Sequence, residues 1–119
     1  MRTTLTKSLT FEAAHWLPTF PEGHKCRRIH GHSFRVDIIV TGDVPEDDGY
    51  LIDYGQIKRA AQSVVDQLDH RLLNDIDGLT NPTAEHIAKW LYDRIRPQLP
   101  QLTAIRVHET PTSTAEYTG

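Results

Sequence analysis

The sequence predicts an α+β domain in which a four-stranded antiparallel sheet carries two helices on one face. Near both ends of the chain, apolar and polar residues alternate as they do in half-buried strands. Across residues 54–97 the apolar spacing changes to three and four, which is typical of amphipathic helices. The resulting order (ββααββ) favours this fold class, because strands and helices occupy separate stretches of an α+β chain.

The composition is typical of one soluble globular domain, here residues 1–119, with 38% apolar and 24% charged residues. A net charge of −3 argues against a general nucleic-acid binder, although a local basic cleft could still bind a small anion. No segment approaches the ~20 apolar residues of a membrane span. The polar N-terminus does not resemble a secretory signal, and the single cysteine cannot form an internal disulfide. We therefore expect a cytoplasmic protein without a membrane partner.

The first two strands are predicted at Thr4–His15 and His30–Thr41, and we expect them to pair in an antiparallel manner. In the first strand one face collects Leu5, Leu9, Phe11 and Ala13, with His15 next on that face. In the second strand one face collects Phe34, Val36, Ile38 and Val40, with His30 and His32 at its start. The opposite face of the second strand carries Ser33, Arg35 and Asp37.

The first predicted helix starts at Tyr54 and ends near "LDHRLLND", with an apolar stripe made of Ile57, Ala60, Ala61, Val64, Val65 and Leu68. The second starts at Asn81-Pro82, because asparagine is a good cap and proline suits the first helical position, and it ends before Pro97. Its apolar stripe consists of Ile87, Trp90, Leu91 and Ile95. Two further strands are predicted at Leu102–Glu109 and Ser113–Thr118.

Three histidines continue the apolar stripes of the first two strands. A polar ring on an apolar face is unfavourable without a partner. If His15, His30 and His32 converge on Zn²⁺, the metal satisfies all three rings and keeps a fourth position open, as in catalytic zinc sites. The alternative for a His-Gly-His sequence alone is hydrogen-bonded core or surface histidines. Apart from His70 at the end of the first helix, the other histidines, at positions 24, 86 and 108, are expected to be solvated.

Cys26 lies four residues before His30, in a loop with Lys25, Arg27 and Arg28. Positive neighbours raise the thiolate fraction of a cysteine, so Cys26 is a candidate base or nucleophile. Two alternatives stay open at this point. The thiol could be a small buried apolar group, or it could be a fourth zinc ligand that makes the metal site structural.

Acidic residues give weaker signals. Asp69 precedes His70, and a carboxylate can orient an imidazole for general acid-base work, although a histidine at a helix C-terminus is the simpler interpretation. Glu109 shares a strand face with Ile105 and Val107, so it either reaches solvent or binds the N–H groups of a heterocycle. Asp53 and Thr83 are interpreted as a turn acid and a helix-start hydroxyl.

Six segments, in order along nearly the whole chain, resemble the 6-pyruvoyltetrahydropterin synthase superfamily: "FEAAHWLP", "CRRIHGHS", "LIDYG", "LDHRLLN", "NPTAEHIAKWLY" and "VHET". The spacing of three residues between Cys26 and His30 resembles that of the bacterial branch, the 6-carboxy-5,6,7,8-tetrahydropterin synthases of queuosine biosynthesis. Pyruvoyl enzymes typically have a longer gap there. The resemblance implies a tunnelling fold, in which sheets join into trimeric barrels that usually pair into hexamers, with active sites between subunits.

The resemblance also implies a role for each matching position. The zinc ligands match His15, His30 and His32, and the catalytic thiol matches Cys26. The proton-relay pair, which in the family approaches from a neighbouring subunit, matches Asp69 and His70. The pterin anchor matches Glu109, and a pterin-contacting threonine matches Thr83.

The implied reaction converts 7,8-dihydroneopterin triphosphate to 6-carboxy-5,6,7,8-tetrahydropterin and releases acetaldehyde and triphosphate. Zinc would bind the side-chain hydroxyls, Cys26 would remove a carbon-bound proton, and His70 would shuttle protons. Lys25, Arg27 and Arg28 are candidates for triphosphate binding. The alternatives are a 6-pyruvoyltetrahydropterin synthase and a zinc-stabilised binding module without turnover.

Overall fold

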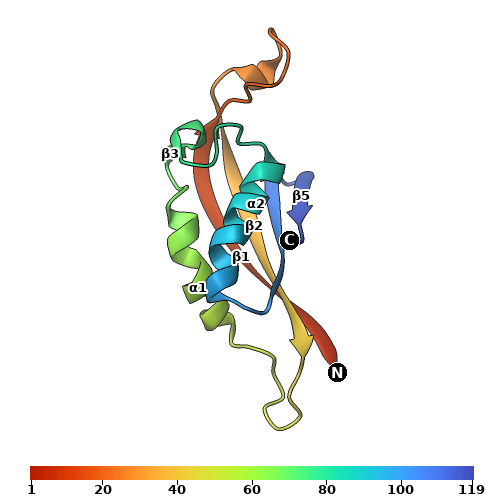
Figure 1. Ribbon diagram of the computed structural model, residues 1–119. Helices are drawn as coiled ribbons and strands as arrows, with labels where there is room; N and C mark the ends of the chain where they lie inside the picture. The colour runs from red at the N-terminus through yellow and green to blue at the C-terminus, as the bar shows by residue number, and fades with distance from the viewer.

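A computed structural model describes all residues of the chain, Met1–Gly119. Its strands are β1 (Arg2–His15), β2 (His30–Asp43), β3 (Arg71–Leu72), β4 (Leu102–Thr110) and β5 (Ser113–Tyr117). Its helices are α1 (Tyr54–Asp66) and α2 (Ala84–Ile95), with short 3-10 turns at Lys25–Arg27, Leu73–Asp75 and Arg96–Gln98. Both helices lie against the same face of the sheet (Figure 1). The predicted α+β class and the two-helix layer are confirmed.

The sheet has five strands in the order β3-β1-β2-β4-β5, and it is mixed. The prediction of four antiparallel strands was wrong because β3 adds a parallel strand that pairs Arg71 with Ala13 and Leu72 with Ala14. A two-residue strand has no room for an alternating pattern, so nothing in the sequence marks it. The other three strand pairs are antiparallel, as expected.

A long hairpin, β1 with β2, organises the molecule. Its register runs without a break from the pair Arg2 and Asp43 to the pair His15 and His30. The hairpin extends beyond both ends of the helix layer and gives the chain an elongated shape of 58 × 23 × 21 Å (Figure 1). The two strand ends that carry histidines are therefore held directly opposite each other at one end of the molecule.

The core fills the space between the sheet and the two helices. It contains 24 buried apolar residues, among them most of the predicted stripes of β1, β2, α1 and α2. Leu5 and Ala60 of those stripes are only partly buried and pack against the core. Phe11 and Phe34 stack at 4.8 Å between ring centroids, directly below the histidine end of the hairpin. Burial of one such side chain contributes about 1.5–3 kcal/mol, so this layer forms a firm base for the histidines.

Each helix begins with a side-chain cap. Asp53 accepts from the backbone N–H of Gly55 at the start of α1, and Thr83 accepts from the N–H of His86 at the start of α2. The predicted start of the second helix at Asn81-Pro82 was wrong by two residues. The physical reason is that the backbone of Thr83 is extended, with ψ 161, and its hydroxyl takes the capping role assigned to asparagine.

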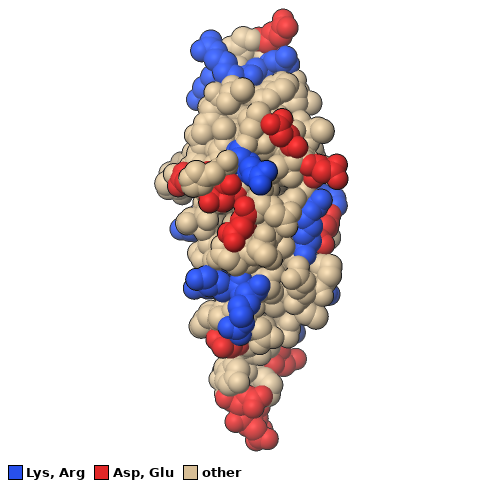
Figure 2. Space-filling model, turned by 90° about the vertical axis from the view of Figure 1, so that its left-hand side faces the viewer, with Lys and Arg blue, Asp and Glu red and all other residues tan.

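Neither helix is long and apolar enough to cross a membrane. The charges are distributed unevenly along the long axis (Figure 2). Lysine and arginine gather at the end that holds the β1–β2 connection, which contains Lys25, Arg27 and Arg28. Acidic residues gather at the opposite end, where the chain leaves β2 through Glu46, Asp47 and Asp48.

Candidate metal centre and active-site cleft

The three predicted histidines meet at the end of the β1–β2 hairpin. His15 is the cross-strand partner of His30, and His32 lies two residues further on the same face of β2. The ring centroids are 4.6 to 5.2 Å apart in all three pairings, each in an edge-on orientation. One nitrogen from each ring lies within 4.8 Å of the others, a spacing suited to ligation of one metal ion.

Backbone carbonyls fix two of these rings. Nδ1–H of His15 donates to the carbonyl of Pro82 at 2.8 Å, and Nδ1–H of His30 donates to the carbonyl of Arg28 at 2.6 Å. Because a carbonyl can only accept, each ring must carry its proton on Nδ1. The Nε2 atoms therefore present lone pairs, which is how metal-binding histidines are commonly oriented.

The histidine cluster contains polar atoms without partners. His15 is fully buried, and Nε2 of both His15 and His32 is buried without a hydrogen bond. The nearest acidic atom, Oε1 of Glu109, is 3.5 Å from Nε2 of His32, which is longer than an ordinary hydrogen bond. Burial lowers the pKa of both His15 and His32, so the neutral ligand form is favoured near neutral pH. Three neutral imidazoles suit a zinc ion, with a fourth position left open.

A cleft of ≈480 Å³ opens beside the histidines, and its lining includes the thiol and the carboxylate predicted from the sequence. The lining residues are Lys25, Cys26, His30, Gly31, His32, Glu109, Thr110 and Ser113. Thr110 and Ser113 carried no recognisable signal in the sequence, since isolated hydroxyl residues are common in strand ends and turns. The cleft therefore combines histidine side chains, a free thiol and one carboxylate.

Loop contacts bring Cys26 back to the strand ends. The N–H of Leu17 donates to the carbonyl of Cys26 at 2.8 Å, and the N–H of Cys26 donates to Nδ1 of His24 at 3.0 Å. His24 is thus a half-buried cap of the turn at Lys25–Arg27, and the expectation that it is simply solvated was wrong. The thiol itself is free and partly exposed.

Glu109 occupies a β-bulge. Pairing between β4 and β5 matches His108 with Thr114 and then Thr110 with Ser113, so Glu109 is the extra residue between two matched pairs. Bulges re-aim side chains and are frequent next to active sites. This one sets Glu109 against His32 at the wall of the cleft.

The three basic loop residues differ in their surroundings. Arg27 is committed to the loop, because its Nη1 donates to the carbonyls of Pro18 at 2.6 Å and Phe20 at 3.2 Å. Arg28 is exposed and does not line the cleft, whereas Lys25 does. Lys25 is therefore the only basic side chain on the cleft wall.

Asp69 and His70 form a pair beyond the end of α1. Oδ2 of Asp69 is 2.9 Å from Nδ1 of His70, and its Oδ1 accepts from the N–H of Glu12 at 2.9 Å. The bond from Glu12 and then that from His70 lower the pKa of Asp69. His70 has a left-handed backbone, with φ 58, and its N–H donates to the carbonyl of Glu12. Adjacency in the sequence does not establish a contact, and the structure shows that the two side chains do form one.

The pair does not face the thiol. His70 lines a second hollow of ≈570 Å³ together with Glu12, Ser33 and Arg71, and Cys26 is absent from that lining. His32 and Gly31 lie on the walls of both hollows. Within one chain, His70 and Cys26 thus line different hollows, which share only Gly31 and His32.

Thr83 lines neither hollow. Its hydroxyl caps α2, which agrees with the interpretation as a helix-start hydroxyl and leaves the pterin contact without structural support in a single chain. The side chain of His86 is exposed as expected, but its Nδ1–H donates to the carbonyl of Asn81 at 2.7 Å.

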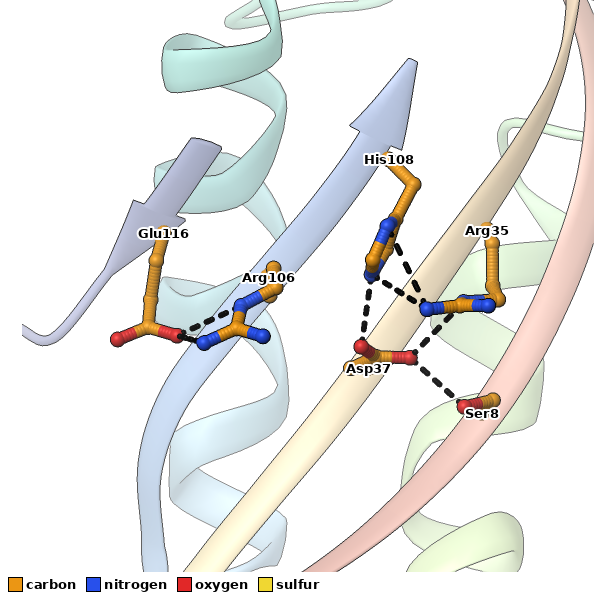
Figure 3. Close-up of polar contacts among 6 residues, drawn as sticks. All are labelled: Ser8, Arg35, Asp37, Arg106, His108 and Glu116. Atoms are coloured by element: carbon orange, nitrogen blue, oxygen red, sulfur yellow. Dashed lines mark hydrogen bonds and ion pairs between the residues drawn. The ribbon is translucent and has the colours of Figure 1, made fainter. Parts of the chain in front are cut away.

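His108 is buried, and the expectation of a solvated side chain was wrong. Its Nε2–H donates to Oδ2 of Asp37 at 2.7 Å, as Figure 3 shows, on the sheet face away from the helices. Asp37 also accepts from Ser8 at 2.7 Å and lies 3.3 Å from Nε of Arg35. Burial alone would raise the pKa of Asp37, but the bonds from Ser8 and His108 outweigh it and lower that pKa.

Comparisons with known proteins point to one family. Residues 4–119 match the family model described as 6-pyruvoyl tetrahydropterin synthase. The chain is 42% identical to a 6-carboxy-5,6,7,8-tetrahydropterin synthase of Synechocystis sp., covering 93% of this chain and 89% of that protein. It is 34% identical to the protein of the same description from Bacillus subtilis, covering 95% and 83%. The structure of Caenorhabditis elegans 6-pyruvoyl tetrahydropterin synthase superposes with a TM-score of 0.90 at 24% identity, covering 100% of this chain and 96% of that one, and supports the fold.

Proposed function

The chain belongs to the 6-pyruvoyl tetrahydropterin synthase family, and on that premise we propose that it is a zinc-dependent 6-carboxy-5,6,7,8-tetrahydropterin synthase of queuosine biosynthesis. Its substrate would be 7,8-dihydroneopterin triphosphate, and its products the carboxypterin, acetaldehyde and triphosphate. One observation carries the proposal. Three histidine nitrogens, two of them buried without a partner, converge beside a cleft that also holds a free thiol and a carboxylate.

Residues of the cleft can divide the chemistry among them. His15, His30 and His32 would hold zinc, which supplies Lewis-acid polarisation of the substrate side chain when bound. Cys26, as thiolate, would remove a carbon-bound proton from that side chain. Glu109 would accept hydrogen bonds from the guanidine-like edge of the pterin, because an ionised carboxylate can accept two parallel N–H groups.

The triphosphate needs positive charge at the other end of the substrate. Lys25 is the only basic side chain on the cleft wall, and Arg27 is already bonded to two carbonyls. We assign Lys25 to the triphosphate for that reason and leave Arg28 as an exposed neighbour. Substrate would then lie across the cleft with its ring at Glu109, its carbon chain at the histidines and its phosphates at Lys25.

The Asp69–His70 pair is proposed to act on the site of a neighbouring subunit. Its separation from Cys26 within one chain supports this arrangement, because a proton relay must lie within hydrogen-bond reach of the reacting group. We therefore propose a homo-oligomer of this single-domain chain, with trimeric barrels paired into hexamers. Thr83 would reach pterin only in such an assembly, and a cytoplasmic location remains a prediction.

The deciding experiment is incubation of zinc-loaded protein with 7,8-dihydroneopterin triphosphate, followed by identification of the aldehyde and pterin products. Acetaldehyde and carboxypterin in equal amounts are expected. A pterin that keeps its three-carbon side chain would assign the pyruvoyl reaction instead. Stoichiometric zinc without any turnover would favour the third candidate, a zinc-stabilised binding module.

A further inference from the structure

We infer that Thr83 and His86 are positioning residues for the metal centre, because they hold the turn whose Pro82 carbonyl orients His15. The inference rests on the proposed metal site. It gives Thr83 a role different from the pterin contact implied by resemblance, and it gives His86 a role where none was expected. Both residues act on the site through Pro82.

The turn before α2 is closed by four hydrogen bonds. Oγ1 of Thr83 accepts from the N–H of His86 at 3.2 Å, and Nδ1–H of His86 donates back to the carbonyl of Asn81 at 2.7 Å. These two bonds tie the first turn of α2 to Asn81 and Thr83, the residues on either side of Pro82. The N–H of Thr83 also donates to Asn81 at 2.9 Å, and its carbonyl accepts from Ile87 at 2.9 Å. The residues on both sides of Pro82 are thereby fixed.

Pro82 has one polar atom to offer, its carbonyl, and that atom accepts from Nδ1 of His15 at 2.8 Å. The contact joins positions 67 residues apart in the chain and is buried. No other hydrogen bond holds the His15 ring, since its Nε2 has no partner. The direction of the Nε2 lone pair therefore depends on where the α2 turn places this carbonyl.

Second-sphere hydrogen bonds of this kind alter metal affinity by about 10- to 100-fold when they are removed. An effect through Pro82 is one step further from the metal, so the lower limit is expected. The competing interpretation is that Thr83 is an ordinary helix cap, which stabilises α2 and has no particular relation to the metal.

Asp53 offers a matched control for that interpretation. Its side chain also caps a helix, α1, by accepting at 2.9 Å from a backbone N–H, in this case that of Gly55, two residues on. Figure 1 shows that α1 begins at the lower end of the helix layer, whereas α2 begins at the upper end. Loss of either cap should destabilise its helix, but only the loss of the Thr83 cap should alter the orientation of His15.

The first experiment measures zinc affinity by competition with a chromophoric chelator, at a temperature where every variant is folded. Thr83→Val is expected to weaken zinc binding about tenfold, whereas Thr83→Ser, which keeps the hydroxyl, stays within about twofold of the unchanged protein. Asp53→Ala should also stay within about twofold. His86→Leu should behave like Thr83→Val, and His86→Gln should retain most of the affinity. Equal affinities for Thr83→Val and Asp53→Ala would overturn the inference.

A second readout needs no metal. In the metal-free protein, the Nδ1–H proton of His15 should give a slowly exchanging NMR signal, which Thr83→Val loses and Asp53→Ala keeps. If the signal persists in Thr83→Val, the turn does not position the ring and the inference is wrong. If the unchanged protein binds no zinc but the signal behaves as expected, the proposed function fails and the positioning of His15 stands.

Discussion

The histidine triad and the cluster of Ser8, Arg35, Asp37 and His108 lie on opposite faces of the same sheet, and they differ in how their polar atoms are satisfied. His108 donates to Asp37, which in turn accepts from Ser8, so the buried carboxylate of this cluster has several partners. In the triad, Nε2 of His15 and of His32 is buried and has none. A buried polar atom without a partner is unfavourable unless a ligand supplies one. The buried carboxylate of the His108 cluster is satisfied within the chain, whereas the triad has two buried nitrogens that a ligand could satisfy.

Both clusters depend on strand register. The pair His15 and His30 is set by β1–β2 pairing, and the pair Arg35 and His108 is set by β2–β4 pairing. Because side chains alternate along β2, His32 faces the helices' side while Arg35 and Asp37 face the other. One strand thus carries two of the triad histidines on one face and the buried partner of His108, Asp37, on the other.

The largest contrast is expected from the thiol. Cys26→Ala should reduce kcat by about 10²- to 10⁴-fold, because a positioned base is lost, while zinc content stays the same. Product formation and bound zinc should be measured on the same preparation. Loss of zinc together with activity would make Cys26 a fourth ligand, and the triad would then be closed like the other cluster.

Substitutions in the His108 cluster should change the stability of the protein. Asp37→Ala should lower the free energy of unfolding by about 3 kcal/mol, because it leaves the buried His108 without its acceptor. Urea unfolding of the metal-free protein measures the difference. Glu116→Ala is the control, since its bond with Arg106 is exposed on the same face and should contribute less than about 1 kcal/mol.

Zinc bound at the histidine triad should stabilise the folded protein by mass action. At a free concentration one hundred times its Kd, zinc should add about 2.7 kcal/mol to the free energy of unfolding. The same increment is expected in Asp37→Ala, because distant sites are nearly additive, and none is expected in His32→Ala. Thermal unfolding with and without a chelator checks this. An increment that survives in His32→Ala would place the metal elsewhere.

Substitution of Lys25 tests whether the cleft binds the triphosphate of the substrate. Lys25→Met should raise KM for the triphosphate substrate about tenfold, which corresponds to about 1.4 kcal/mol, and should leave zinc binding unchanged. Arg28→Met is the matched control, because that residue is a basic neighbour outside the cleft. Equal effects of the two substitutions would indicate a general electrostatic attraction in place of a contact.

The smallest expected effect is the loss of the stabilisation by Asp37 at low pH. The pKa of Asp37 is lowered in the folded protein, so its stabilising contribution is present above the unfolded value of about 3.9 and is lost as pH falls through the folded value. The stability difference between the unchanged protein and Asp37→Asn should therefore narrow from about pH 5 to about pH 2. A constant difference over that interval would show that ionisation of Asp37 does not support the fold.

The convergence of the three histidines could be predicted because it needs only strand parity and one antiparallel pair. Both follow from the alternation around His15 and His32, and the register then brings the ends together. The position of Cys26 relative to the rings could not be derived in this way. It depends on a loop closed by the bond from Leu17, and loop geometry leaves no periodic signal.

The buried His108 was missed for a related reason. Parity correctly placed Asp37 on the face away from the apolar stripe, and His108 opposite to Glu109. What the sequence did not supply was the neighbour relation of β2 and β4, two strands far apart in the chain. Sheet order is a long-range property, so two polar residues on separate strands could not be paired from local patterns. The β-bulge at Glu109 was hidden for the same reason.

The outer edge of β1 has a consequence for how this protein should be handled in solution. Only Ala13 and Ala14 are paired on that side, so from Arg2 to Phe11 no strand of the chain covers the edge. An open edge of this length is a template for a strand from another copy. Folding and association would then be linked, and the midpoint of thermal unfolding should rise with protein concentration. Dilution alone would weaken the protein, with no change in its sequence, pH or metal.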